Sequence, residues 1–403
     1  MGRSIRVTIL ALLVLSLTQN VISESAVNLS DTIFLNESDL GLEGATISPD
    51  GKVVIGFGAE SSIFAIDSVN PLNNSKLDWD EEGAFLDGDF HPGGRTALIV
   101  GSGGKVVRLD MSNFSLDRAE GGFYFGQTDL LSVSWNGDGS WAYIGGEEGF
   151  IWRARWLEEG AEIHQMEETG ASDVNSIDCL NQWNICIVVT NLDGIGVITS
   201  DHQIHWLGGV GYPWIGITCP SMNDDACVAV SSDKNVALIE LDPYNPSNSG
   251  IEVVNLPEVG GQFNGVGFQA EGRSIITVSP FSMIEHSIVI GNSYPWLENS
   301  DAVNFDAELA NGRLVATWPT SENSGWAITS FGGVVQYMPK ETVDDPEGIL
   351  GIWLIVVVIG GALLLAVSAL ASSSTTLSGW ITGRIGNEEE KKRENRKRRK
   401  KSK

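Results

Sequence analysis

The residues that could do chemistry are few, and the four cysteines are the most informative of them. Six residues separate Cys179 from Cys186, and seven separate Cys219 from Cys227. Each pair flanks a polar turn between two apolar segments, so its members can face each other across a hairpin. A four-cysteine metal site would need C-x2-C spacing, which the chain lacks. The spacing predicts two local disulfides, Cys179–Cys186 and Cys219–Cys227, that carry no chemistry.

The histidines and carboxylates give a weaker indication of catalysis. His202 and His205 lie in a strand-like segment, where a spacing of three sends side chains to opposite faces. Residues 78–89 resemble a calcium-binding loop, but position five is Glu, position twelve is Asp and no flanking helices are evident. No nucleophile elbow, P-loop, H-E-x-x-H motif or dinucleotide fingerprint occurs. We therefore expect no catalytic residue, no bound metal and no cofactor.

A repeated unit must position these residues. Between residues 30 and 340, apolar strand-like segments alternate with turns rich in Gly, Asn and Asp. The first turn of each copy recurs near residues 49, 92, 137, 181, 222, 270 and 321, a spacing of about 41 to 51 that suits a four-stranded propeller blade. Seven copies predict an all-β, seven-bladed β-propeller, with six or eight blades, a sandwich array or an open solenoid as alternatives. Residues 32–35 are expected to complete the last blade and close the ring.

Three segments resemble blades of WD40-like and photosystem-assembly-factor-like propellers: residues 139–153 (GSWAYIGGEEGFIWR), 325–335 (GWAITSFGGVV) and 198–206 (ITSDHQIHW). The resemblance covers residues 30–340 and is generic. No Trp-Asp pair ends the blades, and the Asp-box pattern of sialidases is absent. The resemblance implies the architecture strongly and the function weakly.

The two ends of the chain predict a membrane topology. Arg3 and Arg6 precede an apolar run at 7–17, which is typical of a cleaved signal peptide within residues 1–25, cut after Ser23 or Ser25. A linker at 341–348 leads to residues 349–371, which are almost continuously apolar and long enough to span a bilayer. The basic tail within 372–403 is expected to be cytoplasmic, against anionic lipid headgroups, which we prefer to nucleic acid as its partner.

The charge of the chain bounds its partners. The formal net charge is −27, and the part outside the basic tail is more negative still. Such a field repels nucleic acid and favours cations or basic partners. Because the acidic residues are scattered, solubility in salty surroundings is the preferred interpretation.

The loops that enter each inner strand, and those that join second and third strands, are the expected binding face. The candidate residues are Gln127, Asp129, Glu147, Glu148, Asp173, Asn175, Tyr212, Trp214, Gln262 and Phe263. Exposed aromatics make binding anchors, although Trp214 is equally well explained as packed between blades. We expect a single-pass protein of the cell membrane whose propeller binds proteins or surface polymers outside the cell. The alternative is a hydrolase or lyase that uses carboxylates, with or without a divalent cation, in the central channel.

Overall fold

The computed structural model describes residues 25–157, 160–180, 182–219, 226–340 and 388–401. The chain divides into two units between Lys340 and Glu341, and the described residues up to Lys340 form the first. The predicted transmembrane segment at 349–371, the linker at 341–348 and all of the predicted signal peptide except Ser25 lie outside the described residues. None of the helices in the described part of the chain is long and apolar enough to cross a membrane.

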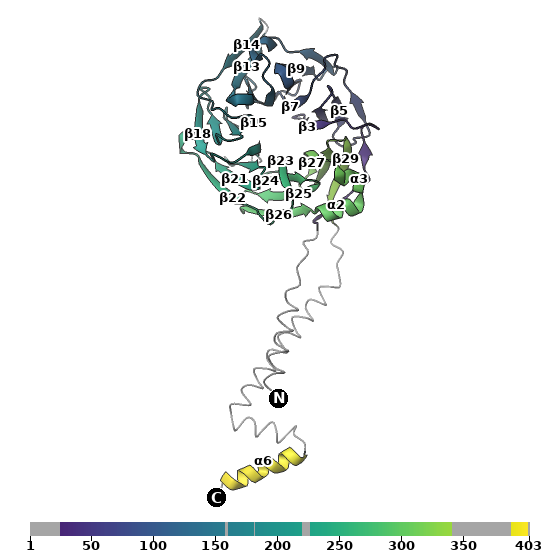
Figure 1. The fold of residues 1–403 in the computed structure, drawn as a ribbon, viewed down its shortest axis with the longest axis vertical. Helices are drawn as coiled ribbons and strands as arrows, with labels where there is room; N and C mark the ends of the chain where they lie inside the picture. Colours follow the sequence, from purple (N-terminus) through teal and green to yellow (C-terminus); the bar gives the residue numbers. More distant parts are fainter. Residues whose placement is uncertain (1–24, 158–159, 181, 220–225, 341–387, 402–403) are drawn as a thin grey trace. The chain divides into compact units, whose positions relative to one another are not determined.

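The described residues of the first unit form seven antiparallel sheets arranged as blades around a central opening (Figure 1). The innermost strands of blades 1 to 7 are β3 (Leu42–Ile47), β7 (Phe85–Phe90), β11 (Leu130–Trp135), β15 (Val174–Cys179), β19 (Trp214–Thr218), β23 (Gln262–Ala270) and β27 (Leu314–Ser321). Each contacts the innermost strand of the next blade, and β27 contacts β3, so the ring is closed. The predicted seven-bladed propeller is confirmed.

The middle two strands of each blade are the most buried, because blades cover them on both faces. The second strands are β4 (Val53–Gly58), β8 (Thr96–Gly101), β12 (Ala142–Gly146), β16 (Cys186–Thr190), β20 (Ala226–Ser231), β24 (Arg273–Ser279) and β28 (Ser324–Thr329). The third strands are β5 (Ile63–Asp67), β9 (Lys105–Asp110), β13 (Ile151–Leu157), β17 (Ile195–Ile198), β21 (Asn235–Glu240), β25 (Ser282–Ser287) and β29 (Gly333–Pro339). Every residue of β16 and β17 is buried, which explains why these strands read as continuous apolar runs.

The outer strands are shorter or more polar. They are β6 (Asn74–Lys76), β10 (Ser115–Arg118), β14 (Gly160–Gln165), β18 (Ile204–Gly208), β22 (Gly250–Asn255) and β26 (Asn292–Leu297) in blades 1 to 6. They lie at the rim of the ring (Figure 1), where one face meets solvent.

All seven innermost strands carry a register irregularity at the same place. It follows a buried apolar residue, and the pairs are Leu42/Gly44, Phe85/Asp87, Leu130/Ser132, Val174/Ser176, Trp214/Gly216, Phe263/Gly265 and Leu314/Ala316. A bulge bends a strand and increases its twist. Its repetition shows that one backbone shape is used at every blade.

Blade 7 is closed by the start of the chain, as predicted. Strand β2 (Ile33–Phe34) pairs with β29, and so does β1 (Val27–Leu29), which the sequence did not reveal. Ser25 is buried, and its Oγ accepts a hydrogen bond from the Glu298 amide at 2.9 Å. The folded domain therefore begins before residue 30, and cleavage after Ser23 would keep Ser25 in it.

Short helices interrupt the β pattern. α2 (Asn299–Phe305) and α3 (Ala307–Asn311) lie in the loop that enters blade 7, where Asp306 caps α3 by accepting from the Glu308 and Leu309 amides. Single 3-10 turns are η1 (Ser102–Gly104), η2 (Gly122–Phe125), η3 (Glu147–Gly149) and η4 (Pro246–Asn248). In the second unit the basic helix α6 (Glu388–Lys401) falls within the predicted tail.

Candidate binding faces

The propeller has two loop faces, which we define by their connections. The entry face consists of the loops that lead into the innermost strands and the turns that join second to third strands. The hairpin face consists of the turns that join innermost to second strands and third to fourth strands. Most of the sequence-predicted binding residues lie in entry-face loops, because antiparallel pairing brings both kinds of entry-face connection to one end of each blade.

Two of the predicted binding residues are core residues. Trp214 begins β19 with no exposed surface, and its Nε1 donates to the Gly209 carbonyl at 2.8 Å. Phe263 is 2 % exposed and packs among the apolar residues between blades 5 and 6. Both occupy the buried apolar position that precedes the bulge of the innermost strand. Neither side chain can reach a partner. For Trp214 the structure agrees with the alternative interpretation, packing between blades, whereas the assignment of Phe263 to the binding face was wrong.

Three further predicted residues hold neighbouring blades together. The Asp129 carboxylate accepts from the Gly103 amide at 2.7 Å, and Asp173 accepts from the Glu148 amide at 3.1 Å. Each joins the residue before one innermost strand to the second turn of the preceding blade. Asn175 donates to the Trp214 carbonyl of the next blade at 2.6 Å. Their polar atoms form hydrogen bonds between adjacent blades. The sequence pattern alone could not distinguish this structural role from a role in binding a partner.

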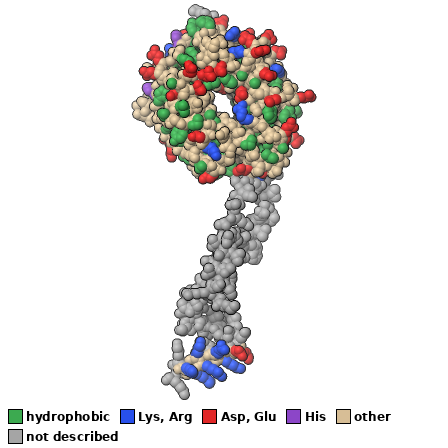
Figure 2. All heavy atoms as spheres, in the orientation of Figure 1, with side chains coloured by type: hydrophobic (Ala, Val, Ile, Leu, Met, Phe, Trp, Pro, Cys, Tyr) green, Lys and Arg blue, Asp and Glu red, His purple; other side chains and the backbone are tan. Residues whose placement is uncertain are grey.

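The remaining predicted residues lie on the surface. Gln127, Glu147, Glu148 and Gln262 are exposed, and Tyr212 is 36 % exposed. Glu148 adopts a φ of 56° within the tight η3 turn, in the left-handed region that few residues other than glycine occupy. Figure 2 shows acidic side chains spread around the ring and an open channel mouth at its centre. The exposed carboxylates suit a partner that carries positive charge.

A pair of exposed aromatic rings is the feature that sequence reasoning missed. Phe123 is 78 % exposed and Tyr124 is 52 % exposed, and their rings lie 4.2 Å apart between centroids. Phe125, the next residue, is buried and meets Trp152 edge to face at 5.4 Å. The run Phe-Tyr-Phe between Gly122 and Gly126 was the available signal, because three successive aromatics of a short turn cannot all point inward.

The loop that presents these rings is built tightly. Gly121 has a φ of 82°, and a Cβ there would meet the Ile163 side chain at 2.7 Å. On the other side, a Cβ on Gly104 would meet the Gly126 carbonyl at 2.6 Å, so this loop lies directly against the η1 turn of blade 2. Such contacts hold Phe123 and Tyr124 on a fixed platform.

The channel is lined mainly by small and apolar residues, with three aspartates in its wall. Asp87 accepts from the Val133 amide, Asp89 from the Trp135 amide and Asp178 from the Cys219 amide, each at 2.8 Å. Desolvation raises the pKa of Asp87 to about 7, of Asp89 to about 6 and of Asp178 to about 7. Each of these carboxylates therefore joins its own blade to the next one by a hydrogen bond.

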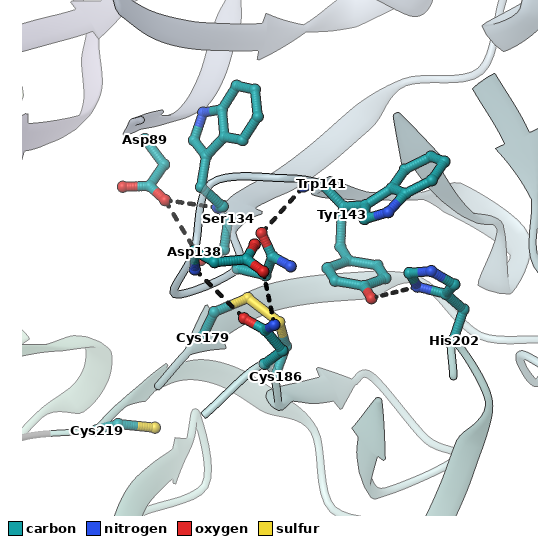
Figure 3. Close-up of a disulfide and its surroundings, with 12 residues drawn as sticks. Asp89, Ser134, Asp138, Trp141, Tyr143, Cys179, Cys186, His202 and Cys219 are labelled. Carbon is teal, nitrogen blue, oxygen red and sulfur yellow. Dashed lines mark hydrogen bonds between the residues drawn. A yellow bond between two sulfur atoms is a disulfide. The ribbon is translucent and has the colours of Figure 1, made fainter. Parts of the chain in front are cut away.

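The two predicted disulfides are confirmed. Cys179–Cys186 and Cys219–Cys227 join innermost to second strands in blades 4 and 5, with Cα atoms 3.9 and 4.1 Å apart. Figure 3 shows Asp138, in the corresponding turn of blade 3, beside the first disulfide. Asp138 accepts from the Asn184 amide group at 2.7 Å, which ties blades 3 and 4 together on the hairpin face.

The histidines are parts of the blade structure. His202 and Tyr143 are hydrogen-bonded at 2.7 Å between Nδ1 and the phenol oxygen, and the His202 ring meets Trp141 at 5.1 Å (Figure 3). His202 lies in a turn and His205 in β18. Among the described residues, no group of three His, Cys, Asp or Glu side chains is placed to hold a metal ion.

Comparison with known proteins identifies the fold. No protein-family model and no curated protein matches the chain. By contrast, 1639 chains of solved structures match, and so widespread a fold does not by itself indicate a function. One is the β-propeller domain of Cps50 (Swd1) from Myceliophteria thermophila, with a TM-score of 0.61, 9 % identity, and coverage of 77 % of this chain and 99 % of that one. The chain therefore has the fold of a seven-bladed β-propeller, similar to that of this domain.

Proposed function

We propose that this chain is a membrane-tethered scaffold that binds a protein partner outside the cell through the entry face of blades 2 and 3. The observation that carries the proposal is the exposed Phe123–Tyr124 pair, whose rings are in contact, displayed on a loop whose backbone is fixed on both sides. Large exposed aromatics on a rigid support are the usual anchors of protein interfaces.

The residues around this pair indicate the shape and charge that a partner should have. Glu147 and Glu148 lie on the same face, and Glu147 donates its amide to the Asp129 carbonyl at 3.1 Å in the segment that follows the aromatic loop. A partner with an apolar pocket bordered by Lys or Arg would therefore complement the site in shape and charge.

The tether proposal rests on the two ends of the sequence, and the propeller is compatible with it. The Lys340 amide donates to the Ala26 carbonyl at 3.0 Å, so both ends of the described propeller meet at the outer edge of blade 7. A chain that leaves from this rim need not cover the loops of blades 2 and 3. Protease digestion of intact cells tests the topology: the propeller should be digested from outside, whereas a tag placed after Lys403 should be protected.

Capture from native membranes tests the binding proposal. The full chain, tagged and solubilised in detergent, is compared with the double variant Phe123→Ala/Tyr124→Ala and with Tyr294→Ala, a comparably exposed aromatic on the rim strand β26 (44 % exposed). We expect a partner that the wild type and Tyr294→Ala retain and the double variant loses. Equal retention by the double variant would refute the entry-face site.

A further inference from the structure

A second pocket lies in the groove between blades 2 and 3, on the side of the hairpin face. It has a volume of approximately 700 Å³, within the ~300–1,000 Å³ of small-ligand sites. Its polar and aromatic lining comes from five segments and includes His91, Arg95, Arg108, Trp135, Arg155 and Trp156. In so acidic a chain, three arginines among the lining residues of one pocket call for a chemical explanation.

Two of these arginines differ from the other arginines of the propeller. Arg118 pairs with Glu81, Arg155 with Glu162, Arg273 with Glu285 and Arg313 with Glu43, while Arg153 lies over the Trp141 ring at 5.0 Å. Within the described part of the chain, Arg95 and Arg108 form no ion pair within 4 Å. Asp117 lies opposite Arg108 in the strand register, and the charge of Arg108 helps to lower the pKa of Asp110, so the Arg108 guanidinium is only partly balanced. Both residues line this pocket.

An orphaned donor lies in the same wall. Trp135 is only 9 % exposed, and its Nε1–H is buried without a hydrogen-bond partner among the described residues. Leaving such a group unpaired is costly, so an acceptor supplied by a ligand would be favoured. His91 is not that acceptor, because its Nε2 contacts the Gly139 carbonyl at 3.1 Å and its Nδ1 accepts from the Gly93 amide.

We infer that this pocket binds a carboxylate-bearing sugar, a uronic-acid residue of a short acidic glycan. Guanidinium groups bind carboxylates through paired, charge-assisted hydrogen bonds, which assigns the acid group to Arg95 and Arg108. Trp135 and Trp156 have ring centroids 6.1 Å apart and provide flat apolar walls, and a pyranose presents a flat C–H face with hydroxyl oxygens at its edge. An acidic peptide side chain has no such face. The site is separate from the aromatic pair proposed for protein binding, so either proposal can fail alone.

Calorimetric titration of the full chain in detergent tests the assignment, with trigalacturonic acid as the probe. Its methyl ester keeps the rings and removes the charge, and triglutamate keeps the charge and removes the rings. Binding of the acid alone supports the proposal, whereas equal binding of the ester or preferential binding of triglutamate overturns it. Raising the salt concentration should weaken the binding, because screening acts on exposed guanidinium groups.

Single substitutions locate the site. Arg95→Gln and Arg108→Gln should each weaken binding about tenfold, and Arg118→Gln, a surface arginine paired with Glu81, should leave it unchanged. Trp135→Phe keeps an aromatic ring and removes the N–H, and it should also weaken binding. Thermal unfolding of each variant separates lost binding from lost folding, and unchanged affinity in both folded arginine variants would refute the proposal.

Discussion

At the scale of single residues, the aspartates of this propeller connect blades as well as conferring charge. Asp87, Asp89 and Asp178 in innermost strands each accept a backbone N–H from the next blade, and Asp129 and Asp173 each accept one from the preceding blade. A carboxylate that accepts a backbone N–H makes a stronger bond than a neutral group, but a desolvated carboxylate also resists ionisation. Desolvation dominates at the channel wall and hydrogen bonding dominates at the loop face. Neutralising an aspartate should therefore stabilise the protein at the channel wall, whereas removing one should destabilise it at the loop face.

At the channel wall, ionisation should reduce stability. The folded pKa of Asp87 is about 7 against an ordinary value of 3.8, so the folded state retains a proton that the unfolded chain releases between about pH 4 and pH 7. The free energy of unfolding should therefore fall as pH rises through this window. Asp87→Asn keeps an oxygen for the Val133 amide and abolishes the titration. We expect it to be more stable than wild type at pH 8 by about 1–2 kcal/mol, and no more stable below pH 4.

Chemical denaturation at the two pH values measures this difference. Asp31→Asn, which removes an exposed carboxylate, is the control for overall charge and should show a much smaller change. A loss of stability in Asp87→Asn at pH 8 would show that the folded protein favours the ionised carboxylate, and the prediction would be wrong.

At the loop face, removal of the acceptor should be costly. Asp129→Ala leaves the Gly103 amide without its 2.7 Å partner, and we expect a destabilisation of about 1–2 kcal/mol. Asp129→Asn should restore most of the loss, because the amide oxygen can still accept. Gln127→Ala, at an exposed neighbour, should change the unfolding midpoint little. Equal midpoints for all three variants would argue that Asp129 has no structural role.

At the scale of strands and turns, the sequence predicted the features that recur in every blade, but not the contacts that individual residues make with other blades. The period, the blade count, both disulfides and the closing segment at 32–35 follow from local patterns of apolar residues, turns and cysteines. The roles of Trp214, Asp129 and Asn175 depend on contacts with residues that are not their neighbours in the sequence; Asn175, for example, bonds to the adjacent blade. The Arg95–Arg108 pocket arises in a similar way, from segments of two blades.

The disulfides stabilise turns that other blades close with side chains. In blade 1 the Ser48 hydroxyl accepts from the Val53 amide at 3.0 Å, and in blade 3 Asn136 accepts from the Trp141 amide at 3.0 Å. Blade 4 has Cys179–Cys186 at this place. A loop this short stabilises by roughly 2–3 kcal/mol when closed. Cys179→Ser/Cys186→Ser should therefore lower the unfolding free energy by that amount, as measured by chemical denaturation in non-reducing buffer.

A second double variant tests whether the two disulfides act independently. Cys219→Ser/Cys227→Ser removes the other disulfide. The two losses should add in the quadruple variant, because the serine variants keep the hydrogen bond from the Cys219 backbone amide to Asp178 that joins the two hairpins. A quadruple variant as stable as either double variant would show that the two hairpins depend on each other.

At the scale of the whole propeller, stability depends on closing the ring. Blade 7 is made from both ends of the propeller, with β27 to β29 from one end and β1 and β2 from the other. Without the first strands, β29 would present an unpaired edge, and Tyr337 and the apolar residues beside Val27 would lose their cover. The start of the propeller sequence therefore contributes to the stability of the entire ring.

Deletion of residues 25–35 should lower the unfolding temperature sharply and cause aggregation through the open edge of β29. A matched variant that starts at Ser25 keeps both closing strands and the hydrogen bond between Ser25 and the Glu298 amide. It should melt in one cooperative transition. Adding a peptide of residues 25–35 to the shortened protein should restore part of the lost stability, to an extent that rises with peptide concentration. A shortened protein that melts like the matched variant would show that the ring holds without its closing strands.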